Sequence, residues 1–226
     1  MSSDAVGERA ALQRERSLEL ARKVGEWLQP LTGTEQVLDA GCGTGAFALA
    51  IAGNVGAVVG VDAHAASLEA ARLVAPTNVH LQQGDVTHLD LEDHAFDIVG
   101  CFRVLHHVTA PERVLAELAR VVRPDGRALV VDQLRERDPA VATANERFER
   151  ERDASHNRTL HREEIVELLE RSGFEVVRSA VEEETRDVER FLDLVGLTGG
   201  ERERVRRLAP ADAYEVEVGW FLARRA

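Results

Sequence analysis

The chain has 226 residues, 44% of them hydrophobic, and a formal net charge of −12. This length suits one domain with insertions, and the hydrophobic share is enough for a sizeable core. The negative charge argues against nucleic acid and anionic membranes as partners. With 2 cysteines there is neither a disulfide framework nor zinc-ligand spacing, and the absence of a signal peptide or long apolar run predicts a soluble, cytoplasmic protein.

The first predicted element is an amphipathic helix over residues 9–31. Its apolar residues Leu20, Val24, Trp27 and Leu28 recur at helical spacing, and Pro30 marks its end. Packing on a sheet is its expected role.

A glycine-rich turn follows. Residues 36–38 read as the end of a buried strand and residues 47–52 as the start of a helix. Between them, Gly41, Gly43 and Gly45 allow backbone angles that a side chain would forbid. Such a turn lets the bare backbone approach a nucleotide-like ligand, with free N–H groups facing the polar end of that ligand.

Two cofactor classes are compatible with this turn. Gly41-x-Gly43-x-x-Ala46 satisfies the looser dinucleotide pattern, so a nicotinamide-dependent oxidoreductase is an open alternative. Asp39, two residues before the first glycine, argues the other way. Its carboxylate would repel a pyrophosphate and attract an ammonium group.

The next predicted strands also end in residues that could contact a ligand. Strand 57–62 ends at Asp62, 17 residues beyond Gly45 and close to the ~20-residue interval at which an acid meets ribose hydroxyls. A carboxylate accepts hydrogen bonds from two vicinal hydroxyls, although an acid here could also serve only as a helix N-cap. Strand 79–85 ends at Asp85, and strand 96–101 ends at Cys101.

Helices are predicted over residues 67–74 and 111–122, and another strand over residues 127–132. Strands alternating with helices imply a parallel sheet with right-handed crossovers, and ligands bind at the carboxyl ends of such strands. Asp39, Asp62, Asp85 and Cys101 should therefore converge on one cavity mouth.

An ordered set of motifs extends over residues 35–132. They are Asp39-x-Gly41-x-Gly43-x-Gly45, Gly60-Val61-Asp62, Gly84-Asp85, Phe96-Asp97-Ile98-Val99, His106-His107-Val108 and Leu118-x-Arg120-Val121-Val122-Arg123-Pro124-x-Gly126. The set resembles the class I S-adenosylmethionine-dependent methyltransferases of the type 11 group, which includes the ubiquinone and menaquinone C-methyltransferases. The resemblance implies an α/β fold: a Rossmann-like doubly wound sheet of about seven strands, the last antiparallel, with helices on both faces. It also implies transfer of a methyl group to an O, N or C atom of a small molecule, by in-line displacement.

The same resemblance implies the residues that hold S-adenosylmethionine. Asp85 would meet the adenine amino group, and the Val86 backbone would meet an adenine ring nitrogen. Ala63 stands where the family usually has a larger apolar residue against the adenine. The full predicted cofactor set is Asp39, Gly41, Cys42, Gly43, Gly45, Asp62, Ala63, Asp85, Val86 and Cys101.

The second half of the chain contains two long connections. Residues 133–160 form an insertion that is predicted to be partly helical, followed by a helix over 162–171 and a strand over 174–181. Residues 182–212 form the second connection, with two short helices separated by a break at Gly199-Gly200, before a final strand over 214–222. Both connections leave the sheet at its ligand face, so we expect them to cover the substrate mouth of a single domain spanning residues 1–226.

Candidates for the chemistry come last. His106 follows the strand that ends at Cys101, and His156 lies in the polar cluster of the insertion. An imidazole titrates near neutrality, so either could take a proton from the acceptor, whereas His107 is predicted to be structural. Arg103 and Arg158 could hold an anionic substrate group. We expect no metal, a monomer or homodimer, and a small-molecule partner; a protein that binds S-adenosylmethionine without catalysis is a further alternative.

Overall fold

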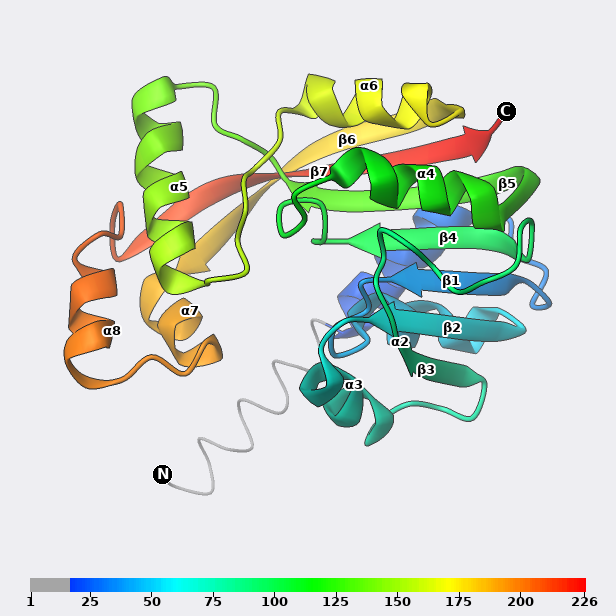
Figure 1. Cartoon of the computed structure of the whole chain (residues 1–226), viewed down its shortest axis with the longest axis horizontal. Coiled ribbons are helices and arrows are strands. Elements are labelled where there is room, and N and C mark those ends of the chain that lie inside the picture. Colours follow the sequence, from blue (N-terminus) through cyan, green and yellow to red (C-terminus); the bar gives the residue numbers. More distant parts are fainter. Residues whose placement is uncertain (1–16) are drawn as a thin grey trace.

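The computed structural model describes residues 17–226, which form one seven-stranded sheet flanked by helices (Figure 1). The strand order is β3-β2-β1-β4-β5-β7-β6. β1 (Gln36–Ala40), β2 (Ala57–Asp62), β3 (Val79–Gln83), β4 (Phe96–Phe102) and β5 (Val122–Gln133) run parallel, and β7 (Ala213–Arg225) is antiparallel to both β5 and β6 (Phe174–Asp187). The predicted doubly wound sheet of seven strands with an antiparallel last strand is confirmed.

Helices pack on both faces of the sheet, as the apolar spacing predicted. On one face α4 (Pro111–Val121) and α6 (Arg162–Arg171) bury Leu115, Leu118 and Ile165. On the other, the helix of residues 17–28 and α2 (Ala46–Ile51) bury Trp27 and Phe47. Residues 9–16 of the predicted first helix lie outside the described residues.

The remaining helices are shorter or lie beyond the sheet. A 3₁₀ turn, η1 (Ala52–Asn54), leads into β2, and α3 (Ala65–Arg72) links β2 to β3. α5 (Pro139–Arg152), α7 (Val188–Leu194) and α8 (Gly199–Arg206) lie beyond the edge at which the parallel strands end (Figure 1). Asp138 begins α5, because its side chain accepts a hydrogen bond from the Ala140 N–H at 2.8 Å and Pro139 fits the first helical position.

Two strands are each six residues longer than predicted: β5 begins at Val122 instead of residue 127 and ends at Gln133, and β6 extends past Val181. β6 continues six residues past Val181, to Asp187, through a run of charged residues that is typical of a loop. Every residue of this extension pairs with β7, from Glu182 opposite Val218 to Asp187 opposite Ala213. The ladder on β7 therefore overrides the local preference, since it satisfies backbone groups that a loop would leave to water.

The two short helices predicted in the second connection are present, but the break between them lies at residues 195–198 and not at Gly199-Gly200, because both glycines belong to the first turn of α8. The first N–H groups of a helix have no intrahelical partner, so glycine is tolerated there better than in a helix interior. Within the described residues, no helix is both long enough and apolar enough to cross a membrane.

Candidate functional site

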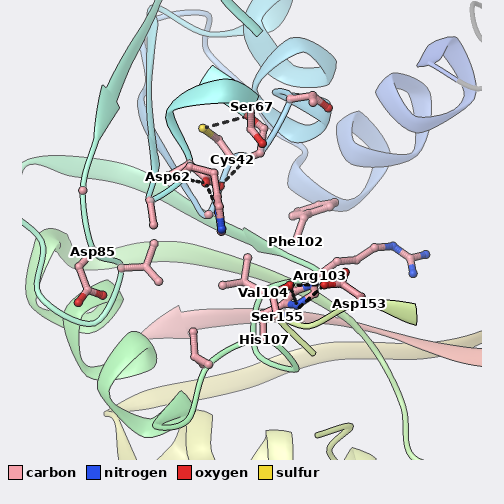
Figure 2. Close-up of a pocket in the computed structure, with 18 residues that line it drawn as sticks. Cys42, Asp62, Ser67, Asp85, Phe102, Arg103, Val104, His107, Asp153 and Ser155 are labelled. Carbon is pink, nitrogen blue, oxygen red and sulfur yellow. Dashed lines mark hydrogen bonds and ion pairs between the residues drawn. The ribbon is translucent and has the colours of Figure 1, made fainter. Parts of the chain in front are cut away.

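A cavity of about 610 Å³ opens at the carboxyl ends of the parallel strands. This volume lies within the ~300–1,000 Å³ typical of small-molecule sites. The glycine turn and Asp62 lie on one side of the cavity, and His107, Ser155 and Asp153 lie on the other (Figure 2). The cavity thus joins the first half of the chain to the insertion after β5.

The glycine turn is held in place by backbone hydrogen bonds to β2. The N–H groups of Gly41 and Cys42 both donate to the carbonyl of Val61, at 2.8 and 3.0 Å. Gly41, with φ +76°, packs so closely on Val104 that a Cβ there would lie 2.4 Å from Val104 Cγ2. Gly43, with φ +50°, lines the cavity, and a Cβ on it would meet nothing within 4 Å. The turn therefore presents bare backbone to the cavity.

Asp39 lies beneath this turn rather than on the cavity wall. One carboxylate oxygen, Oδ2, accepts a hydrogen bond from the Ala48 N–H at 3.0 Å and so ties β1 to the first turn of α2. Within the part of the chain that the structure describes, the other oxygen is buried without a hydrogen-bond partner. Burial and the nearby Asp62 raise the pKa of Asp39 to about 7, so a cation close by would favour its ionised form.

Asp62 lines the cavity and joins two backbone segments. Its Oδ2 accepts from the Gly43 N–H at 2.7 Å, and its Oδ1 accepts from the His64 N–H at 2.8 Å. His64 precedes α3, which the structure describes in full, and the Asp62 side chain accepts no hydrogen bond from an N–H inside that helix. Asp62 therefore positions the glycine turn and does not serve as the N-cap of α3. Oδ1 also lies 3.3 Å from the His64 Nδ1, whereas Oδ2 has a second lone pair that a ligand hydroxyl can use.

Some of the other residues predicted to contact the cofactor line the cavity, and others do not. Gly41, Cys42, Gly43, Ala63, Asp85 and Val86 line the cavity, whereas Gly45 and Cys101 do not. Cys101 is fully buried, and burial raises the pKa of its thiol well above the ordinary value. Burial, together with Asp39 and Asp62, likewise raises the pKa of Cys42. Neither thiol is therefore available as a thiolate nucleophile.

The two histidines predicted as bases are both turned away from this cavity. His106 is buried, and its Nδ1 is hydrogen-bonded to the buried Asp132 of β5. His156 is buried against Glu146 of α5, to which its Nε2 is hydrogen-bonded. Neither residue lines the cavity. This placement differs from the expectation that both histidines face the substrate. Each imidazole has a buried carboxylate partner, and that hydrogen bond holds the ring inside the fold.

The two arginines predicted to bind substrate lie at different sites. Arg103 lines the cavity and forms an ion pair with Glu184 of β6. It has φ 56°, a conformation that side chains rarely adopt and that clusters at functional sites. Arg158 pairs instead with Glu164 and faces a separate surface hollow on the outer side of α5. Only Arg103 is therefore placed to contact a ligand in the cavity.

Of the three histidines His106, His107 and His156, the one that lines the cavity is His107, for which the sequence predicted a structural role; His64 lines the cavity on the opposite side, next to Asp62. The His107 Nδ1 lies 3.0 Å from the Ser155 hydroxyl, and that hydroxyl donates to Asp153 at 2.6 Å. The available signal was the His106-His107 pair itself, since only one of two adjacent side chains can easily turn inward. Burial and the neighbouring His106 lower the pKa of His107, so its imidazole is mostly neutral at pH 7.

A second cavity, of about 600 Å³, adjoins the first. Phe102 and Arg103 line both of them. Aromatic walls come from Phe102, Phe191 and Trp220, and the Lys23 ammonium lies 3.9 Å from the Trp220 ring centroid. The ion pairs Lys23–Glu182 and Arg103–Glu184 connect the body of the protein to β6 at this cavity.

Comparisons with known proteins agree on one family. Residues 38–130 match the family described as a methyltransferase domain. The uncharacterised methyltransferase YcgJ of Bacillus subtilis is 38% identical over 127 residues, which are 54% of this chain and 50% of that protein. An O-methyltransferase of Penicillium expansum is 30% identical over 194 residues, 80% of this chain and 67% of that one.

The solved structure of a candidate methyltransferase from Bacillus halodurans gives a TM-score of 0.80 at 26% identity, covering 89% of this chain and 98% of that one. The chain spans about half the length of the curated relatives it matches first.

Proposed function

Since this chain belongs to the S-adenosylmethionine-dependent methyltransferases, in the group of the ubiquinone and menaquinone methyltransferases, we propose that it methylates an O, N or C atom of a small molecule. Family membership sets aside the nicotinamide-dependent oxidoreductase. S-Adenosylmethionine is the cofactor of this family, and when bound it supplies a methyl group already activated by its sulfonium.

The first cavity fits this cofactor. Asp39 keeps a buried carboxylate oxygen without a partner among the described residues, and the Gly43 backbone is bare where it faces the cavity. Asp62, Asp85 and Val86 line the cavity, which supports the proposed contacts of Asp62 with ribose hydroxyls and of Asp85 and Val86 with the adenine. The donor set thus suits a nucleoside with an amino-acid tail.

One observation carries the proposal of a small-molecule acceptor: the cofactor cavity and its neighbour share Phe102 and Arg103. An acceptor in the second cavity would lie next to the methyl end of the cofactor. The aromatic walls suit an apolar or aromatic body. Holding two reactants in line and excluding water can supply several kcal/mol of catalysis, about 7–11 in the best cases.

We also propose that segments 133–160 and 182–212 cover the substrate mouth. Asp153 and Ser155 of the first segment line the cofactor cavity, and Glu184 and Phe191 of the second line its neighbour. Such segments commonly close over bound ligands.

Binding of S-adenosylhomocysteine, the demethylated cofactor, is expected to slow amide hydrogen exchange in segments 133–160 and 182–212. The physical reason is that contacts across the mouth reduce local opening of α5, α7 and α8. Peptides from α6, on the face of the sheet, serve as the control and should exchange at unchanged rates. Unchanged protection in both segments would contradict a covering role.

Asp62→Ala should weaken binding of S-adenosylmethionine by about tenfold or more. Hydrogen bonds to a charged group contribute about 1.5–3 kcal/mol, and this carboxylate also holds the Gly43 N–H. Isothermal titration calorimetry gives the affinity. Asp90→Ala removes an exposed carboxylate outside the cavity and is the control. An Asp62 variant that binds as tightly as the parent would refute the ribose assignment.

The function itself is tested by incubating the protein with isotope-labelled S-adenosylmethionine and metabolite extracts. A labelled small molecule is the expected product, and its structure identifies the methylated atom. Tight binding of S-adenosylmethionine without any labelled product would favour a binding protein without catalysis. Parallel titration with NADH is expected to give no binding.

A further inference from the structure

The loop after α5 brings a serine and an aspartate to His107, one of the two histidines that line the cavity; the other, His64, lies beside Asp62. Ser155 and Asp153 lie on the same side of the cavity as His107 (Figure 2). Asp153 also accepts the Ser155 N–H at 2.9 Å, so one carboxylate oxygen fixes both the backbone and the hydroxyl of Ser155. The hydroxyl is thereby held in one orientation.

The donors and acceptors around Ser155 then determine the His107 tautomer. Although burial pushes the pKa of Asp153 upward, the hydrogen bonds that it accepts from the Ser155 hydroxyl and N–H help to lower it overall. Asp153 is therefore ionised at neutral pH and can only accept. Ser155 has a single hydroxyl hydrogen, which goes to Asp153, so the His107 Nδ1 must donate to the Ser155 oxygen. The basic lone pair of the imidazole is left on Nε2.

The loop that carries these residues is anchored to the histidine pair. The carbonyl of His106 accepts the N–H groups of Asn157 and Arg158, at 2.8 and 3.2 Å. Arg150 donates to the Asn157 carbonyl at 2.7 Å. The position of Ser155 against His107 is thus determined by contacts on both sides of the loop.

From this geometry, and resting on the proposed methyl transfer, we propose that His107 is the proton acceptor of the reaction, positioned by Ser155 and Asp153. The acceptor molecule carries a phenolic or enolic hydroxyl that reaches from the second cavity, past the shared Phe102 and Arg103, to His107 in the first. The acceptor oxygen gives its proton to Nε2 of His107, and its electron pair forms the new O–C bond. The pair of the broken C–S bond stays on the sulfur, and the imidazolium releases the proton to water.

The acidity of the acceptor follows from the weakness of the base. A neutral imidazole removes protons most effectively from groups that are themselves fairly acidic, and the aromatic walls of the second cavity suit a phenolic body. An aliphatic alcohol is a much weaker acid and should react more slowly than a phenol or enol, and a tertiary amine has no proton to give. The groups that face His107 are His106 on its own loop, Asp132 on β5, and Asp153 and His156 on the loop after α5.

The tautomer is tested without any acceptor. Nitrogen-15 NMR of the imidazole rings, recorded on the full chain with S-adenosylhomocysteine, should show hydrogen on Nδ1 of His107. Ser155→Ala and Asp153→Asn should shift the population toward the Nε2–H tautomer. An Nε2–H tautomer in the parent protein would overturn the proposal.

The chemistry is tested with labelled S-adenosylmethionine and a panel of phenols, enols, aliphatic alcohols and tertiary amines. Label should enter phenols or enols, and His107→Ala and His107→Gln should each lower that turnover about 10²–10⁴-fold. Their affinity for S-adenosylhomocysteine should stay within threefold of the parent, which also shows that they fold. The acidic limb of the pH–rate profile should disappear, while His80→Gln, an exposed histidine outside the cavity, changes nothing.

These outcomes separate the two proposals. Label in phenols at the parental rate in both His107 variants, or label in tertiary amines alone, overturns the role of His107 but leaves methyl transfer standing. No labelled product from the panel or from any extract counts against methyl transfer itself, and the tautomer measurement then decides whether the histidine geometry is right.

Discussion

Replacing Glu149 with alanine should lower the free energy of unfolding by about 3–5 kcal/mol, because it leaves a buried arginine without its counter-charge. Glu149 is 3% exposed and accepts hydrogen bonds from Tyr214 at 2.9 Å, Arg186 at 2.9 Å and Arg152 at 2.6 Å. Arg186 is also 3% exposed. These bonds join α5 to β6 and β7, so the variant should loosen the region over the second cavity.

Chemical denaturation at pH 7 measures this loss, and Glu151→Ala is the matched control. Glu151 lies on the same helix but is exposed and pairs with Arg204 at the surface, so its removal should cost less than about 1 kcal/mol. Equal losses in the two variants would show that the buried network does not stabilise the fold.

The pH dependence of the Glu149 effect follows from its pKa. Burial pushes the pKa upward, but Arg152 and Arg186 outweigh burial and lower the pKa below the unfolded value of 4.5. A lowered folded-state pKa means that the stabilisation is present above about pH 4.5 and is lost as the pH falls below it. The difference between parent and Glu149→Ala should therefore narrow in acid.

Gly41→Ala should cost about 2–5 kcal/mol of stability and abolish tight cofactor binding. An alanine at φ +76° is strained by about 1–2 kcal/mol. Its Cβ would also meet Val104 Cγ2 at 2.4 Å, and overpacking of this kind costs about 1–3 kcal/mol more. Gly41 and Val104 both line the cofactor cavity. Relieving the clash would therefore shift at least one of them and change the shape of the cavity.

Gly43→Ala separates strain from the clash with Val104. At φ +50° it carries a similar strain, but its Cβ meets nothing within 4 Å. Without ligand, denaturation should show a smaller loss for Gly43→Ala than for Gly41→Ala, and Val104→Ala should partly restore the Gly41 variant. If the two glycine variants lose equal stability and Val104→Ala restores nothing, the close approach to Val104 has no energetic role.

Much of the fold could be predicted because its signals are local. The strand that ends at Asp62 and the helix α6 have the bounds that their apolar patterns indicated, and the glycine turn joins β1 to α2 as expected. The end of β6 could not be predicted in this way. Its charged residues read as a loop, and only pairing with β7, about thirty positions away, makes them a strand.

The residues of the candidate site likewise fall into those that local sequence signals locate and those that only the structure locates. Asp62, Asp85 and the bare glycines could be located from spacing alone, because a strand end and its turn are set by a few adjacent residues. The roles of the histidines could not. His106 turns inward to Asp132 and His156 to Glu146, which leaves His107 for the cavity.

The sequence by itself determined the order of strands, turns and helices, the family and the acids at the strand ends, since these depend on short-range periodicity and motif spacing. Only the tertiary structure decided which of His106, His107 and His156 lines the cavity, that Ser155 and Asp153 lie beside His107, and that a second cavity shares Phe102 and Arg103. The physical reason is that a side chain takes the direction in which its hydrogen bonds and charge are satisfied. For His107, His106 and Arg103 those partners lie 26 to 81 positions away in the chain.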